Sequence, residues 1–273
     1  MTLHRLEPAD FGKARTVFEP MGHSRAIESI IRGLTPARIL VDDAADPSSA
    51  LTWFKGRAFL SGDPEDPAFR EAAAGVLSGP YRDAIVAQGG EGFLIYHHPE
   101  GWWARLEDAL PGESLARATR LYYHLDAGSG RWDATPPEGF ALTPVDSRLL
   151  ERTDLKNLNL VEDEMRSERL SVEDFLEKSF GYCVVNEGAI AGWCMSEYNA
   201  GERCELGIAT AEGYRRRGLA TLTGRAVIRE AVFRGMGEIG WHCYASNAPS
   251  VATAERLGFR RALEYPVIWV NLG

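Results

Sequence analysis

The sequence has no long apolar run. Within its 273 residues, no apolar stretch approaches the roughly 18 consecutive residues that a membrane-spanning helix needs. Residues 1–15 are polar and are interrupted by Pro8, so they lack the apolar core of a secretory signal. We therefore expect an untethered protein with no membrane partner.

Cysteine is scarce and shows no paired spacing. No CxxC motif occurs, and each thiol lies in an apolar, strand-like context, where a reduced cysteine behaves as a small core residue. The pattern favours a cytoplasmic location. His97 and His98 have no carboxylates at a spacing that suggests metal binding, so no metal is expected. The four cysteines are Cys183, Cys194, Cys204 and Cys243.

Positive charge is outnumbered by negative charge. The chain has 30 lysines and arginines against 39 aspartates and glutamates, which gives a formal net charge of −9. Because proteins that bind nucleic acid need a basic face, this balance argues against a nucleic-acid partner. It would favour a cationic substrate.

The length of the chain exceeds that of a typical domain, so two domains are expected, with one large domain as the alternative. The strongest break in composition is DAGSGRWDATPP at residues 126–137, where glycine, serine, aspartate and proline separate apolar segments. We therefore expect an N-terminal α/β domain over residues 1–130 and a second domain over residues 138–273.

The second half has the more regular pattern. It predicts the element order β-α-α-β-β-β-α-β-α-β, which is a mixed α/β sheet with helices on its faces. The first half loosely echoes part of this order. The expected helices of the second half cover residues 147–160, 171–179, 219–234 and 249–257, and its expected strands cover residues 140–143, 182–185, 189–197, 204–210, 238–244 and 266–270.

The stretch GYRRRGLAT, residues 213–221, sets three arginines before a glycine and a small-residue helix start. A P-loop would need lysine where Leu219 stands. The GxGxxG match at residues 235–240 follows a helix and enters a strand, the reverse of a dinucleotide fold. A third pattern, [Q/R]xxGx[G/A], fits residues 215–220 between an expected strand and an expected helix.

This third pattern suits a diphosphate for physical reasons. The first turn of a helix has unpaired N–H groups and a partial positive charge. Gly218 lets the backbone approach a ligand without an intervening Cβ. Thr221 can add a hydroxyl donor, and the arginines raise the local potential. The alternative is a solvated basic helix start that binds nothing.

The second half also resembles the GNAT superfamily of acyl-CoA-dependent N-acetyltransferases. The arginine–glycine loop is followed by Asn247 after the next strand, and then by a short helix that ends in LGF at residues 257–259. Within the superfamily, the sequence looks most like the subgroup that includes zwittermicin-resistance acetyltransferases. The likeness rests on YRRRGLAT, WHC, Asn247 with Ser250, and AERLGF. The resemblance implies a mostly antiparallel sheet flanked by helices over residues 138–273. We expect the smaller first domain to be a degenerate copy without the cofactor loop.

The resemblance implies acetyl-CoA as cosubstrate. The acyl arm would lie where the strand with residues 206–210 separates from the strand with residues 241–244, and backbone groups of the first strand would pair with it. An amide there would stabilise the oxyanion. For Asn247, a plain helix cap is the alternative. The implied binding residues are Ile208, Ala209, Thr210, Arg215, Arg216, Arg217, Gly218, Leu219, Ala220, Thr221, Asn247 and Ser250.

The resemblance further implies acetyl transfer to a primary amine of a small molecule, which needs a base that accepts a proton from the amine. Glu205 is the candidate base and Glu202 the fallback. An exposed strand glutamate or an ion pair on the sheet surface is the alternative interpretation of Glu205. His242 is a further possible base, although a histidine in the strand EIGWHCY is more often packed or paired.

The proton donor of many relatives is missing. They carry tyrosine four residues before the glycine of LGF, where this chain has Ala254. Tyr244, Ser250 or water would take its place, and a thiol pKa near 8.5 makes thiolate departure feasible without strong acid help. The missing tyrosine motivates an alternative function, a non-enzymatic acyl-CoA-binding or regulatory module.

Substrate choice is expected to depend on the helices after the first strand. There the acidic residues 162–164 could attract a polyamine or another aminated molecule, with a solvated helix face as the alternative. The first domain would wall the substrate cleft or mediate homodimerisation.

Overall fold

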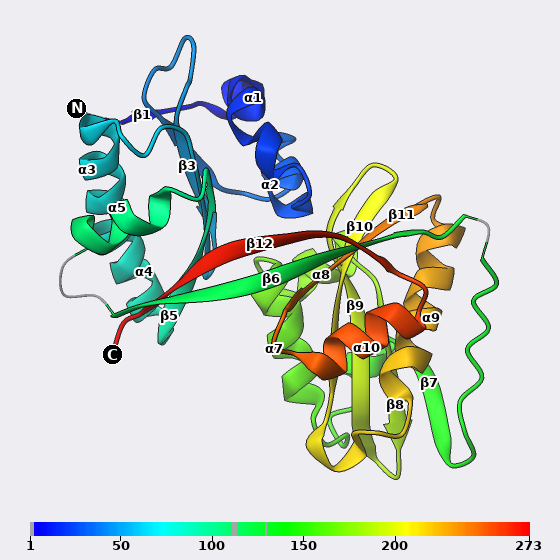
Figure 1. Cartoon of the computed structure of the whole chain (residues 1–273). Coiled ribbons are helices and arrows are strands. Elements are labelled where there is room, and N and C mark those ends of the chain that lie inside the picture. Colours follow the sequence, from blue (N-terminus) through cyan, green and yellow to red (C-terminus); the bar gives the residue numbers. More distant parts are fainter. Residues whose placement is uncertain (1–2, 111–113, 129) are drawn as a thin grey trace. The chain divides into compact units, whose positions relative to one another are not determined.

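The computed structural model describes residues 3–110, 114–128 and 130–273 (Figure 1). The chain divides into two compact units, residues 1–120 with 264–273, and residues 121–263. The proline-rich segment 126–137 lies within the second unit, and the C-terminal end of the chain belongs to the first. The chain therefore passes between the units twice, and a single break in composition could not reveal the return.

The first unit is a mixed sheet with helices packed on it. Its strand order is β1-β2-β3-β4-β5-β12, with every pair antiparallel except β4 with β5. Its strands are β1 (His4–Arg5), β2 (Arg38–Val41), β3 (Ala50–Phe54), β4 (Arg57–Ser61), β5 (Gly92–His98), residues 264–271 of β12 (Arg260–Asn271) and residues 114–120 of β6 (Ser114–Asp126). Its helices are α1 (Arg15–Phe18), α2 (Arg25–Ile31), α3 (Pro67–Val76), α4 (Arg82–Ala87) and α5 (Trp102–Ala109).

The second unit is a mostly antiparallel sheet in the order β6-β11-β10-β9-β8-β7. The pair β10 with β11 is parallel. Its strands are residues 121–126 of β6 (Ser114–Asp126), β7 (Phe140–Pro144), β8 (Gly181–Asn186), β9 (Ala189–Ala200), β10 (Arg203–Thr210) and β11 (Glu238–Tyr244). Its helices are α6 (Ser147–Leu150), α7 (Leu158–Glu168), α8 (Val172–Lys178), α9 (Leu219–Phe233) and α10 (Ala248–Arg256).

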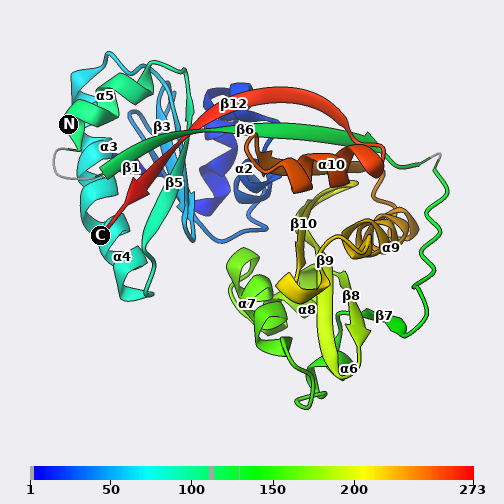
Figure 2. The same cartoon turned by 60° about the horizontal axis from the view of Figure 1, so that its bottom comes forward.

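Helices cover both faces of this second sheet. One core joins Val227 and Ile228 of α9 and Ala254 of α10 to the strands. The other joins Val161 of α7 and Phe175 of α8 to β8 and β9. Figure 2 shows α7 and α9 on opposite sides of β8, β9 and β10. Because side chains alternate along a strand, successive residues of β10 face the two helix layers in turn.

The elements expected beyond residue 138 are largely confirmed, with one clear error. A single helix was expected over residues 147–160, but the chain forms α6 and then α7. Asp146 caps α6 by accepting a hydrogen bond from the Leu149 amide at 3.0 Å. Asn157 then takes the left-handed conformation (φ 67°) and donates from Nδ2 to the Ile190 carbonyl at 2.9 Å. The left-handed Asn157 and its bond to β9 keep α7 separate from α6, and local periodicity does not report that bond.

Two glycines of the first unit should respond in opposite ways to alanine. A Cβ on Gly92 would overlap the Val270 carbonyl oxygen where β5 pairs with β12, whereas a Cβ on Gly75, in α3, would meet no atom within 4 Å. We expect Gly92→Ala to lower the free energy of unfolding by about 1–3 kcal/mol, since the backbone must shift. Gly75→Ala should raise it by about 0.5–1 kcal/mol. Urea unfolding followed by circular dichroism measures both, and a Gly92→Ala protein as stable as the wild type would contradict the packing.

The four cysteines should not react in the folded protein. All are buried and reduced. Burial raises the pKa of the Cys183 thiol to about 12 and the pKa of the Cys194 thiol well above its usual value, so both stay protonated at neutral pH. Since the thiolate is the reactive form, a chromogenic disulfide reagent should modify no thiol in the native state and all four after unfolding. Rapid modification of the native protein would contradict this.

Candidate functional site

The central feature of the second unit is a separation between two parallel strands. The pairs between β10 and β11 are Arg203 with Glu238, Cys204 with Ile239, and Glu205 with Gly240. Beyond Glu205, residues 206–210 of β10 stay paired with β9 on their other side. Alternate backbone amides and carbonyls of β10 therefore face the gap and are open to an extended ligand.

A cleft of about 880 Å³ lies beside the C-terminal half of β10. The C-terminal half of β10, the following loop and the first turns of α9 and α10 line it. Eleven of the twelve binding residues expected from the sequence lie on its walls. They are Ile208, Ala209, Thr210, Arg215, Arg216, Gly218, Leu219, Ala220, Thr221, Asn247 and Ser250.

The start of α9 has the features of an anion site. Gly218 adopts a left-handed conformation (φ 77°) at the N-cap and offers no side chain to cap the helix. The first bond of the helix runs from the Leu222 amide to the Gly218 carbonyl at 3.1 Å. The amides of residues 219–221 precede that bond, and helix geometry leaves them without intrahelical acceptors. A negatively charged group is therefore favoured where they meet the cleft.

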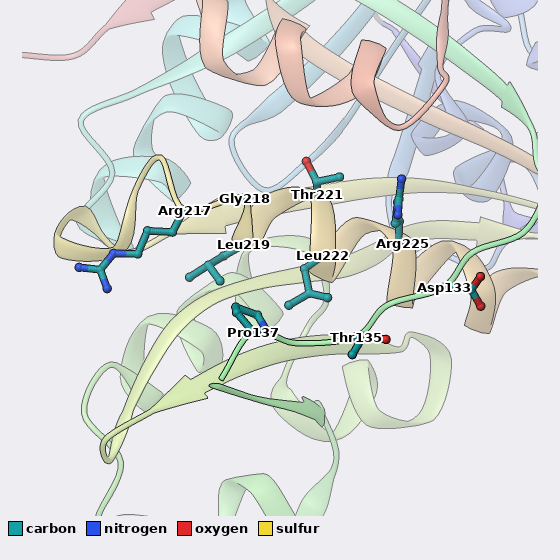
Figure 3. A pocket seen from close by; sticks show the side chains of 9 residues that line it. All are labelled: Asp133, Thr135, Pro137, Arg217, Gly218, Leu219, Thr221, Leu222 and Arg225. Carbon is teal, nitrogen blue, oxygen red and sulfur yellow. The ribbon is translucent and has the colours of Figure 1, made fainter. Parts of the chain in front are cut away.

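Arg217, the twelfth expected residue, lines a different crevice. This crevice, of about 370 Å³, lies between the first turn of α9 and residues 133–137. Figure 3 shows the Arg217 side chain running along the loop, away from Thr221 and Arg225. Its guanidinium lies 5.5 Å from the centre of the Tyr214 ring and donates from Nη2 to the Gly213 carbonyl at 3.4 Å. The three arginines therefore divide between the two hollows.

The start of α10 forms the opposite wall of the cleft. Asn247 is the N-cap, and its Oδ1 accepts a hydrogen bond from the Ser250 amide at 3.1 Å. Ser250 Oγ in turn accepts from Trp241 Nε1 at 3.1 Å. Asn247 thus acts as the helix cap considered as an alternative from sequence, and it lines the cleft as well.

Sequence reasoning missed the cleft-facing side of α10. Ala254, where relatives carry tyrosine, is fully buried in the core. Pro249, Thr253 and Arg256 line the cleft instead. Their spacing of four and then three residues is that of one helix face, so the signal was present in the sequence.

Glu205 lies on the other face of the sheet, at the last registered pair before the strands separate. Only 6% of the residue is exposed. Its Oε1 lies 3.2 Å from His242 Nε2, and the His242 ring stacks on Tyr122 with centroids 4.8 Å apart. Glu202, the fallback base, is exposed in the turn before β10. Tyr244 ends β11 and is half-buried.

Two further carboxylates approach Glu205 from β9 and α7. Glu197 is the register partner of Glu205 on β9. A Cβ on Gly207 would overlap Glu197 Oε1 and lie 3.3 Å from Glu164 Oε1. The other acidic residues of the expected rim, Glu162 and Asp163, pair with Arg166 on the surface. Glu164 therefore differs from its neighbours, because it lies over the sheet beside the strand separation.

Among the described residues, no three or more His, Cys, Asp or Glu side chains form a group able to hold a metal ion. Across residues 3–110, 114–128 and 130–273, no helix has the length and apolar character to cross a bilayer.

Three comparisons bear on the identity of this fold. A family model described as GNAT acetyltransferase matches residues 15–268 and so includes most of both units. The chain is 24% identical, over 98% of each chain, to a Bacillus subtilis (strain 168) protein named uncharacterized N-acetyltransferase YdfB. A Streptococcus suis GCN5-related N-acetyltransferase-like protein aligns with a TM-score of 0.72 at 21% identity, covering 96% of this chain and 99% of the other. A tandem GNAT protein from the clavulanic acid biosynthesis pathway aligns with a TM-score of 0.59 at 13% identity, covering 99% of both.

Proposed function

The chain belongs to the GNAT acetyltransferase family and is an N-acetyltransferase, and from this premise we propose that it moves an acetyl group from acetyl-CoA to a primary amine of a small molecule. The observation that supports this best is the cleft beside β10. It has an anion site at one end, formed by Gly218 and the first turn of α9, and it runs beside the edge of β10 whose pairing with β11 ends at residue 205.

In this proposal the diphosphate of the cosubstrate binds the amides of residues 219–221, with Arg215 and Arg216 supplying positive charge. The backbone of residues 208–210 pairs with the pantetheine arm. An amide of β10 donates to the thioester carbonyl and stabilises the charge that develops on its oxygen. Asn247 and Ser250, at the start of α10, keep the opposite wall in place.

Glu205 is the proposed base. It lies at the point where the strands separate, and the acceptor amine must lose a proton before it can attack. Tyr244 and Ser250 are the candidate proton donors to the departing thiolate. Ala254 stands where relatives have the tyrosine and cannot donate a proton. In this proposal the thiolate therefore leaves largely without a side-chain acid, which the thiol pKa near 8.5 allows.

The first domain, expected over residues 1–130, is proposed to bind no cofactor. It has no counterpart of the sequence RRRGLA at residues 215–220. The fold of the tandem GNAT relative supports its interpretation as a degenerate second copy. Its proposed role is to wall the acceptor site or to join two chains in a dimer. The proposed acceptor class, an aminated small molecule, also follows from the resemblance to zwittermicin-resistance enzymes.

Release of free CoA thiol tests the proposed function. The protein is incubated with acetyl-CoA and, separately, with an aminoglycoside, a polyamine, a free amino acid and a peptide with a free N-terminus. We expect thiol release above the amine-free rate with at least one of these amines. Ala254 motivates the alternative function, an acyl-CoA-binding module without catalysis. That alternative predicts tight acetyl-CoA binding with no amine-dependent release of thiol.

A further inference from the structure

We propose that His242 is a positioning residue for Glu205, and that the two side chains act as one proton-accepting pair at the point where β10 and β11 separate. This inference rests on the proposed acetyl transfer and on Glu205 as its base. It adds a residue that sequence reasoning had weighed only as a competitor of Glu205.

The strand register brings the two side chains together. Glu205 is paired with Gly240, and His242 follows two residues later, on the same face of β11 because side chains alternate along a strand. His242 Nε2 lies 3.2 Å from Glu205 Oε1. The pair therefore bridges the two strands at the start of the gap that would receive the thioester.

The surroundings fix this contact. The side chains of His242 and Glu205 are only 11% and 8% exposed. The Tyr122 ring of β6 stacks on the imidazole at an interplanar angle of 25°. A Cβ on Gly240 would come within 3.1 Å of Glu205 Cγ and 3.2 Å of Tyr122 Cε2, so the glycine leaves room for the glutamate stem and the tyrosine ring. A side chain at position 240 would push them apart.

Electrostatics gives the imidazole a function there. An ionised carboxylate that is buried needs a partner, because desolvation disfavours its charge. Glu205 also faces like charge, since Glu197 and Glu164 lie on the same side of the sheet. Imidazole is the side chain that can supply a positive charge near neutral pH and withdraw it again. The other titratable groups beside this face include the Arg203–Glu238 ion pair, Tyr122, His124 and Asp126 of β6, and Tyr244 of β11. The buried Arg169 interacts electrostatically with Glu197.

The proton balance of the reaction gives the pair its task. The acceptor ammonium first loses one proton to the Glu205–His242 pair, which leaves a neutral amine. The nitrogen lone pair forms the C–N bond to the thioester carbonyl carbon, and the C–S bond then breaks. The thiolate takes the second nitrogen proton, and the pair returns the first proton to water. His242 contributes by holding Oε1 of Glu205 and by sharing the proton it accepts.

Carbon-13 NMR tests the contact without any acceptor. The imidazole rings of the full-length protein supply signals from its six histidines at a fixed pH. The signal that disappears in His242→Gln belongs to His242. Because Glu205 Oε1 lies 3.2 Å from His242 Nε2, we expect Glu205→Gln to move that signal to a different chemical shift. Glu202→Gln, which changes an exposed carboxylate of the preceding turn, should leave it in place. An identical His242 signal in the wild type and Glu205→Gln would overturn the proposal.

Kinetics with an amine that the thiol assay identifies tests the role. His242→Ala should lower kcat by about tenfold to 100-fold with little change in the KM for acetyl-CoA. His242→Gln, which keeps a hydrogen-bond donor but cannot titrate, should recover part of kcat and lose one limb of the pH–rate profile. His4→Gln, at an exposed position of β1, is the matched control. A His242→Ala enzyme with wild-type kcat would overturn the proposal, whereas failure to bind acetyl-CoA at all would instead remove the proposed function.

Discussion

Replacement of Gly218 by glutamate should lower the affinity for acetyl-CoA about 100-fold or more, which corresponds to roughly 3 kcal/mol. Gly218 is the N-cap of α9 and lines the cleft where the helix amides are exposed. Glutamate would place bulk and negative charge against a diphosphate and would occupy the amides that should bind it. Isothermal titration calorimetry with acetyl-CoA measures the change directly.

Gly235→Glu is the matched control for this variant. Gly235 follows the other end of α9 and has a nearly identical left-handed conformation (φ 79° against 77°). A Cβ added at either glycine would meet no atom within 4 Å. Both substitutions therefore carry similar backbone strain and the same added charge. Equal loss of acetyl-CoA affinity in the two variants would mean that strain, and not the anion site, is responsible.

Replacement of Glu205 by glutamine should lower kcat by about 100-fold to 1000-fold, because the amide keeps the shape of the side chain but cannot accept the proton of the amine. The KM for acetyl-CoA should change little, since Glu205 lies on the opposite face of β10 from the core beneath α9 and does not line the cleft. Steady-state kinetics with the amine identified by thiol release provides both constants.

Glu202→Gln serves as the comparison, since Glu202 lies three residues earlier and is exposed. It should retain full activity. Wild-type kcat in Glu205→Gln would remove Glu205 as the base, and a large loss in Glu202→Gln would restore the fallback assignment. Circular dichroism of each variant shows whether a loss of activity comes from unfolding.

Much of the second unit could be predicted from sequence because its signals are local. The residues around Gly218 combine a strand, a glycine with positive φ and an amphipathic helix, and each is visible in a short window of sequence. Family membership could be recognised from the same segment together with Asn247 and the LGF helix, and the family model supports it over residues 15–268. The assignments of individual binding and catalytic residues stay predictions.

The features that escaped prediction depend on contacts between distant segments. The break between α6 and α7 depends on Asn157 bonding to the Ile190 carbonyl. The pairing of Glu205 with His242 depends on the register of β10 against β11, which no single strand specifies. Arg217 follows Arg216 directly in the sequence, yet it lines the second crevice, whose other wall is formed by residues 133–137. In each case the local sequence allows more than one conformation, and a contact formed in the folded chain determines which one is adopted.

A crystal structure of the protein with acetyl-CoA tests the central claim most directly. The account predicts a diphosphate on the amides of residues 219–221 and an acyl arm along residues 208–210 of β10, within the cleft of about 880 Å³. An empty cleft at saturating acetyl-CoA, or a cosubstrate bound elsewhere on the chain, would contradict it.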